Sequence, residues 1–134
     1  MIRKATKADI PRIMDIRGAV RENKLHDPSR VTVDHVAWFV DNPGIFVWEE
    51  DGEIVGFSAA DPRDGSIFAL FVEQAHEGRG IGRALFERAC AVLIDAGCGR
   101  MWLTTDPGTR AEGFYRRAGW RVTGHADGNL VFVR

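Results

Sequence analysis

The chain has 134 residues, of which 45% are hydrophobic and 28% charged, so its size and composition suit one compact domain over residues 1–134 and leave no room for a second. The net charge of −1 gives no general electrostatic reason to expect binding to nucleic acid or to a membrane. The first residues lack the apolar run of a signal peptide, and the longest apolar run is only the six residues 67–72, so we expect a cytoplasmic protein.

The first third of the chain predicts one strand and two helices. Residues 2–5 form the short strand, and the capping-box pattern Thr-x-x-Asp at 6–9 starts a helix. Apolar residues then recur at helical spacing, namely Ile10, Ile13, Met14 and Val20. Residues 21–30 are polar and contain a proline, which predicts a loop, and a second helix is expected over residues 32–40.

The middle of the chain predicts an antiparallel meander. Three segments rich in branched and aromatic residues are separated by turn sequences, namely 45–49, 54–60 and 66–72. The turns between them are Asp51-Gly52 and residues 62–65.

A long helix and another strand should follow. One apolar stripe defines the helix, formed by Leu85, Ala89, Val92, Leu93 and Ala96. Gly97 ends this helix, and residues 101–105 form the next strand. Because a helix connects the strands at 66–72 and 101–105, these two strands should be parallel, with a right-handed crossover.

The last part of the chain predicts a short helix and a hairpin. The capping-box pattern of Thr109 and Glu112 starts the helix, which Gly119 ends. Strands at 120–123 and 130–133 then pair around an Asp-Gly turn. The fold class is therefore α/β, with a mixed and mostly antiparallel sheet.

Three glycines at alternate positions, Gly78, Gly80 and Gly82, lie at the start of the long helix. The first turn of a helix has unpaired N–H groups and the positive end of the helix dipole, and glycine lets an anion approach it closely. Residues 78–134 carry nine arginines against five acidic residues, whereas residues 1–77 carry nine Lys/Arg against fourteen. The excess of arginine around the glycines favours a phosphorylated ligand. The alternative is that the glycines only form a tight turn between strand and helix.

Two other phosphate motifs fit less well. A nucleotide P-loop needs Lys-Ser/Thr where this chain has Arg83-Ala84. A dinucleotide fingerprint needs a glycine at Leu85, although Asp106 would imitate its ribose-binding acid. The P-loop is excluded, and the dinucleotide site stays a weak alternative.

The segments ALFVEQAHEGRGIGRAL (69–85) and LTTDPGTRAEGFYRRAGW (103–120) resemble the GNAT superfamily of acyl-CoA-dependent N-acetyltransferases. This resemblance implies a splayed, mostly antiparallel sheet of about seven strands with about four helices. It also implies that the turn from Glu77 to Arg83 binds the pyrophosphate of coenzyme A through backbone amides, and that Phe71 and Val72 bind the pantetheine arm. The turn residues implied are Glu77, Gly78, Arg79, Gly80, Ile81, Gly82 and Arg83. Glu77 departs from the family's Gln or Arg, so its side chain is expected to point away.

The second segment matches the family at Ala111, Phe114, Tyr115, Gly119 and Trp120. Gly108 stands where the family has an Asn that contacts the cofactor, and the resemblance places Gly108 and Phe114 among the cofactor-binding residues. Helical spacing places Ala111, Phe114 and Ala118 on the core face, with Tyr115 at its edge. The resemblance implies that Tyr115 donates a proton or a hydrogen bond to the departing thiolate; the alternative is a boundary tyrosine with a solvated hydroxyl.

The resemblance implies transfer of acetyl from acetyl-CoA to a primary amine by direct attack, without a covalent acyl-enzyme. The alternative is a coenzyme A-binding module that has lost catalysis, which Glu77 and Gly108 make plausible. The general base is not assigned; its candidates are Glu22, His26, Asp27 and Glu73. The acidic first half hints at a cationic acceptor. The oligomeric state is left open, although members of the family commonly form homodimers.

Metal sites and disulfides are not expected. His35, His76 and His125 lack metal-ligand spacing, and Cys90 and Cys98 match neither a zinc site nor a disulfide framework.

Overall fold

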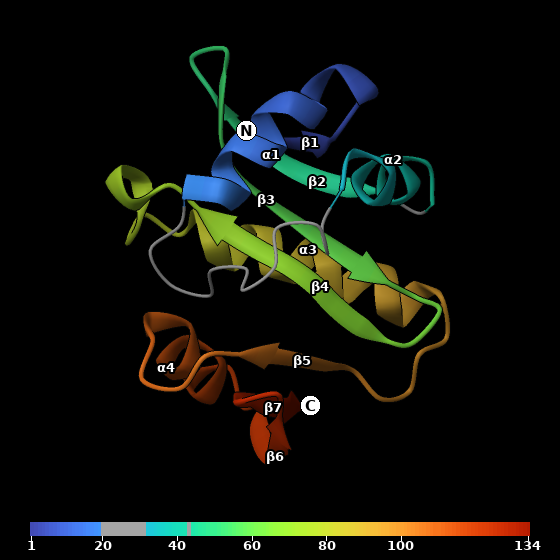
Figure 1. Ribbon diagram of the computed structural model, residues 1–134, viewed down its shortest axis with the longest axis vertical. Coiled ribbons are helices and arrows are strands. Elements are labelled where there is room, and N and C mark those ends of the chain that lie inside the picture. Colours follow the sequence, from blue (N-terminus) through green and yellow to red (C-terminus); the bar gives the residue numbers. More distant parts are fainter. Residues whose placement is uncertain (20–31, 43) are drawn as a thin grey trace.

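The computed structural model describes residues 1–19, 32–42 and 44–134 and contains the elements expected from the sequence (Figure 1). Its strands are β1 (Ile2–Lys4), β2 (Ile45–Glu50), β3 (Glu53–Asp61), β4 (Ser66–Val72), β5 (Trp102–Thr105), β6 (Arg121–Ala126) and β7 (Asn129–Val133). Its α-helices are α1 (Ile10–Ala19), α2 (Val33–Asp41), α3 (Ile81–Asp95) and α4 (Arg110–Arg117), with short 3₁₀ turns η1 (Lys7–Asp9) and η3 (Gln74–His76). The loop predicted at 21–30 and the stripe position Val20 lie outside the described residues.

Within the described residues, seven strands form one sheet in the order β1-β2-β3-β4-β5-β7-β6. All neighbouring strands are antiparallel except β4 and β5, which are parallel and pair at the single position Ser66–Trp102. Their paired ends are the N-terminal ones, so the strands diverge toward Val72 and Thr105 (Figure 1). The α/β fold with a mixed, splayed sheet is confirmed.

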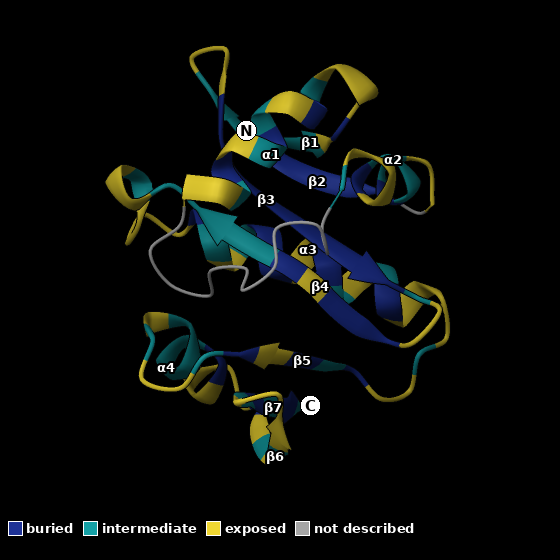
Figure 2. Cartoon of the chain, viewed as in Figure 1, coloured by how far each residue is buried: buried dark blue, intermediate teal, exposed yellow. Residues whose placement is uncertain are grey.

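Helices cover both faces of the sheet. Successive residues of a strand point to opposite faces, so one strand can contact helices on both sides. Ile45 and Val47 pack with α1 and α2, whereas Phe46 between them packs against α3. The buried residues run along the middle strands of the sheet (Figure 2). No helix within the described part of the chain is long and apolar enough to span a bilayer.

A cluster of charged residues fixes the first strand to the first helix. The guanidinium of Arg3 donates to Asp9 at 2.8 Å and to Glu49 at 2.9 Å. Asp9 also accepts the backbone N–H of Thr6 at 2.7 Å, which completes the predicted capping box. The Arg3 hydrogen bond is the main reason that the pKa of Asp9 falls to about 2.

Asp9→Asn should therefore lower the free energy of unfolding at pH 7 by about 1 kcal/mol, a value reduced for solvent screening. A depressed carboxylate pKa stabilises the fold above the pKa of the unfolded chain, near 4, and this stabilisation is lost as the pH falls through about 2. Urea unfolding between pH 2 and 7 should show the wild-type and variant curves converging in acid. Asp15→Asn, at an exposed position on α1, is the control. A deficit in Asp9→Asn that persists unchanged at pH 2 would contradict the ion-pair origin.

Candidate active site

A cleft of about 850 Å³ lies between the end of β4, the glycine turn and α4. Nine of the twelve residues predicted to form the site line it, namely Phe71, Val72, Glu77, Gly78, Gly80, Gly82, Arg83, Phe114 and Tyr115. Three others do not. Ile81 is buried beneath the turn, Arg79 pairs with Glu50 at 2.9 Å, and Gly108 donates its N–H to Glu112 at 2.8 Å. The turn thus offers its backbone to the cleft at alternate residues.

The glycine turn has the conformation that only glycine adopts easily. Gly78 and Gly80 have φ values of 77° and 83°, and a β-carbon on either would meet no protein atom within 4 Å. Gly80 is the N-cap of α3, whose first helical hydrogen bond runs from Ala84 N–H to Gly80 C=O. The N–H groups of residues 81–83 therefore precede the helical ladder and suit an anion.

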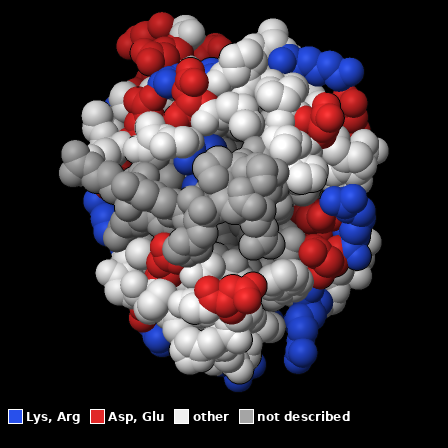
Figure 3. All heavy atoms as spheres, in the orientation of Figure 1, with Lys and Arg blue, Asp and Glu red and all other residues white. Residues whose placement is uncertain are grey.

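Charged side chains surround this turn. Arg83, Arg110 and Arg117 line the cleft, as do Glu73 and Glu77. Contrary to expectation, Glu77 does not point away: its carboxylate pairs with Arg110 at 2.7 Å. That pair links the turn to the start of α4 and offsets the negative charge of Glu77. Among the described residues on the face in Figure 3, both acidic and basic side chains are visible.

Glu77→Gln should tighten coenzyme A binding about two- to fivefold, because it removes one negative charge beside the arginines of the cleft. Isothermal titration calorimetry of the variant at low and high salt would measure the change, which should shrink as salt rises. Asp95→Asn, which removes an exposed carboxylate at the far end of α3, should leave the affinity unchanged. Weaker binding by Glu77→Gln would instead show that the Glu77–Arg110 pair is needed to shape the site.

A second cleft, of about 600 Å³, lies where β4 and β5 diverge and extends toward α1 and α2. Leu70, Phe71, Ala111 and Tyr115 line both clefts. The two spaces therefore meet between the separated strands, with Tyr115 at their junction.

Tyr115 is more buried than the sequence indicated. Only 6% of its surface is exposed, and its ring packs near Phe86 and Phe132 at centroid distances of 5.6 and 5.8 Å. Ala118, expected in the core, is exposed because α4 ends at Arg117. Tyr115 is thus the buried residue of α4, not a residue at its edge. Burial raises the pKa of its phenol well above the ordinary value of 10, and Cys90 adds to this shift.

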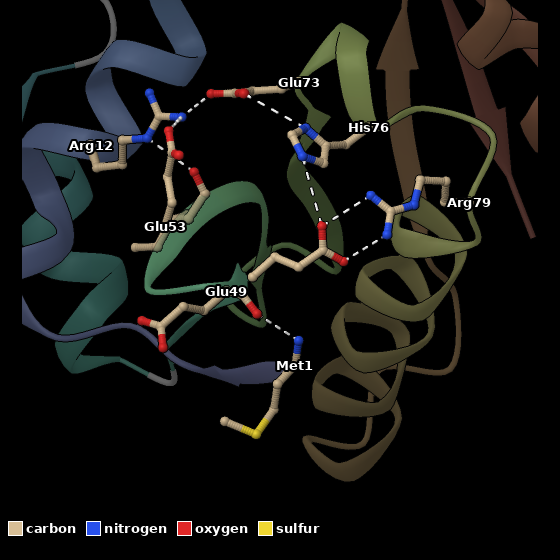
Figure 4. A network of polar contacts seen from close by, with 9 residues as sticks. Met1, Arg12, Glu49, Glu53, Glu73, His76 and Arg79 are labelled. Atoms are coloured by element: carbon tan, nitrogen blue, oxygen red, sulfur yellow. Dashed lines mark hydrogen bonds and ion pairs between the residues drawn. The ribbon is translucent and has the colours of Figure 1, made fainter.

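One of the four candidate bases can be placed. Glu22, His26 and Asp27 lie outside the described residues. Glu73 lines the first cleft, but its carboxylate pairs with Arg12 of α1 and lies 3.8 Å from His76 Nδ1 (Figure 4). Because the Glu73 carboxylate is already engaged by the Arg12 guanidinium, this geometry disfavours Glu73 as the base.

The same contacts hold the glycine turn in place (Figure 4). His76 Nε2 lies 3.7 Å from Glu50, which also accepts both bonds of the Arg79 guanidinium. Arg12 contacts Glu53 as well as Glu73. The network therefore ties α1 and the β2–β3 hairpin to both ends of the turn that precedes α3.

Sequence reasoning missed Arg17, which lines the second cleft. It lies three and four residues after Met14 and Ile13, so it continues the apolar stripe of α1. A charged residue on the core face of a helix was the signal that would have found it. No cluster of three or more metal-binding side chains occurs among the residues that the structure describes.

The sequence profile of the acetyltransferase (GNAT) family matches residues 10–120, which include the described lining of the first cleft and most of that of the second. The chain belongs to this family. The match covers the glycine turn and α4, so the resemblance that these segments suggested is confirmed. No curated protein matches the sequence closely enough to count as a relative.

Solved structures share the GNAT fold over the whole chain. Ribosomal-protein-alanine N-acetyltransferase from Brucella melitensis is 20% identical with a TM-score of 0.79, covering 100% of this chain and 98% of its own. PaiA N-acetyltransferase from Thermoplasma acidophilum in complex with coenzyme A is 13% identical, with a TM-score of 0.81 and coverages of 100% and 97%. YncA from Salmonella typhimurium with its cofactor acetyl-CoA is 22% identical, with a TM-score of 0.76 and coverages of 99% and 91%.

Proposed function

We propose that this GNAT protein is an N-acetyltransferase that moves the acetyl group of acetyl-CoA to a primary amine by direct attack in a ternary complex. The observation that carries the proposal is the meeting of two clefts at Tyr115 between diverging strands. One cleft suits the diphosphate and pantetheine of the donor. The second cleft gives the amine a separate approach to the junction at Tyr115. Donor and acceptor can therefore be bound at the same time, so no acyl-enzyme is needed.

The first cleft has the groups that coenzyme A requires. Backbone N–H groups of residues 81–83 and the left-handed glycines suit the diphosphate, and three arginines supply positive charge. Phe71 and Val72, at the open end of β4, would hold the pantetheine arm. When bound, acetyl-CoA supplies the thioester whose acetyl group is transferred. The co-crystallised coenzyme A and acetyl-CoA of the PaiA and YncA structures support this assignment.

Tyr115 is assigned to the leaving thiolate. A phenol with pKa near 10 would protonate a thiolate whose acid has pKa near 8.5 only at a cost of about 2 kcal/mol. Burial raises the phenol pKa further, so the hydroxyl stays protonated at physiological pH. Its role is therefore to stabilise the thiolate charge by donating a hydrogen bond, in a setting shielded from water.

The acceptor amine must lose a proton before it attacks. A Lys-like amine with pKa near 10.4 is neutral at pH 7 at a cost of about 4.6 kcal/mol. Because Glu73 is held by Arg12, the described part of the site supports a water-mediated route for this proton better than direct transfer to Glu73.

The test combines the purified protein with acetyl-CoA and a panel of primary amines while free thiol is followed. Calorimetry with acetyl-CoA is run in parallel. Amine-dependent thiol release supports the enzyme. Tight binding of acetyl-CoA without thiol release on any amine supports the alternative, a coenzyme A-binding module. The Glu77–Arg110 pair and the engagement of the Gly108 N–H by Glu112 would then explain the missing activity. Absence of binding contradicts both.

A further inference from the structure

Arg17 introduces a positive charge into a cleft with many apolar side chains. Ile13, Met14, Phe39 and Phe57 line the second cleft together with Arg17. The helix α1 presents this residue on the same face as its buried isoleucines. A partly buried guanidinium in such surroundings requires compensation by an acceptor or by a ligand.

The described residues provide only part of the interactions that a partly buried Arg17 guanidinium needs. The Arg17 guanidinium lies over the Phe71 ring, 4.3 Å from its centroid. Its Nη1 is buried and has no hydrogen-bond partner in the described part of the chain. No carboxylate among those residues lies within ion-pair distance of Arg17 either. The contact with the Phe71 ring thus leaves one donor of the guanidinium unused.

The position of Arg17 relates it to the reaction centre. Phe71, on which Arg17 stacks, lines both clefts, as does Tyr115. A group bound by Arg17 in the second cleft would therefore lie on the acceptor side of the junction. Asp106, at the end of β5, lines the same cleft, and its charge acts on Arg17 from beyond ion-pair distance. The described lining of this cleft thus combines one guanidinium, Arg17, with an apolar wall and three carboxylates, Asp64, Asp106 and Asp127.

We infer that the acceptor is an amine that also carries a carboxylate, and that Arg17 binds this carboxylate in the second cleft. The planar guanidinium suits a carboxylate, which would pair with the unused Nη1. The apolar wall suits an apolar side chain, so the acceptor class is an apolar amino acid. This inference rests on the proposed acetyl transfer, and it replaces the cationic acceptor suggested by the acidic first half of the chain.

The test compares each of three apolar amino acids, L-leucine, L-methionine and L-phenylalanine, with its amide and with the amine that lacks the carboxylate. Each compound is titrated into the full chain with coenzyme A present. The amino acids should bind roughly 10- to 100-fold more tightly than their partners. In Arg17→Met this preference should disappear. Arg17→Lys, which keeps the charge but not the planar fork, should retain part of it.

Arg88→Met is the matched control, because Arg88 is exposed and its guanidinium also lies over a ring, 5.6 Å from that of Phe46, on another part of the molecule. This variant should keep the full preference for amino acids. Equal binding of the amino acids and their partners to the wild type, or a preference that survives in Arg17→Met, would overturn the inference. The affinity for coenzyme A alone should be the same in all variants, which separates carboxylate binding from a general loss of structure.

Failure of this inference is distinguishable from failure of the proposed function. Thiol release on amines without any preference for a carboxylate leaves acetyl transfer standing and removes Arg17 from acceptor binding. If acetyl-CoA does not bind, acetyl transfer fails. The amino-acid titration without coenzyme A then decides whether Arg17 binds carboxylates, and no difference between wild type and Arg17→Met would contradict that role.

Discussion

Gly80→Val should weaken acetyl-CoA binding by at least about 100-fold, because its side chain would occupy the space above the helix start that a diphosphate needs. A β-carbon at Gly80 meets no protein atom within 4 Å, so the substitution crowds the ligand and not the fold. The φ of 83° still makes valine strained there, at a cost of about 1–3 kcal/mol in stability. Calorimetry with acetyl-CoA, and a thermal melt to verify folding, measure the two effects separately.

Gly97→Val is the matched control for that strain. Gly97 follows the other end of α3, has a φ of 81°, and likewise has no protein atom within 4 Å of an added β-carbon. Both variants should lose similar stability, but Gly97→Val should bind acetyl-CoA normally. Unchanged affinity in Gly80→Val would refute the assignment of the glycine turn to the diphosphate.

Tyr115→Phe should lower kcat roughly 10- to 100-fold while the dissociation constant of acetyl-CoA changes little. The ring and its packing against Phe86 and Phe132 stay, and only the hydrogen bond to the leaving thiolate is removed. Steady-state kinetics with a reactive amine, with calorimetry for the donor, separates the two quantities.

Tyr115 is the single tyrosine of the chain, which allows a finer test. Incorporation of 3-fluorotyrosine changes this phenol alone, making it more acidic and a stronger hydrogen-bond donor. The labelled protein should keep at least wild-type kcat, and its fluorinated phenol should ionise at a higher pH than free 3-fluorotyrosine, because burial raises the pKa. A raised phenol pKa also means that this contribution to stability is present below pH 10 and lost as the pH rises further. Full activity in Tyr115→Phe would exclude the hydroxyl from catalysis.

Features set by local chemistry were predictable. The left-handed glycines 78 and 80 sit at a strand-to-helix junction, and their spacing alone indicated an exposed backbone. The crossover rule also gave the parallel pairing of β4 with β5. That these strands diverge was not encoded in any local pattern; the splayed sheet was expected only from the family resemblance, and the single paired position is a finding of the structure.

Features set by tertiary contacts were predicted less well. The burial of Tyr115 depends on where α4 ends and on rings from α3 and β7, which helical spacing does not report. The orientation of the Glu77 side chain depends on its hydrogen bond with Arg110, which lies thirty-three residues later in the sequence. Arg17 is a charged residue within the otherwise apolar stripe of α1, so an apolar pattern alone does not indicate it, although its charge on that face is visible in the sequence.

The single-position pairing of β4 with β5 also affects the mechanics of the sheet. Backbone hydrogen bonds between strands hold a sheet together edge to edge, and β4 and β5 have almost none. The described sheet therefore has a seam between these two strands, where its two halves are linked mainly by α3 and the side chains beneath it. A ligand whose amides bond to the open edge of β4 would act as a substitute strand across this seam. Bound acetyl-CoA would then restrict motion of the two halves of the sheet relative to each other, and the protein without ligand would be the more flexible form.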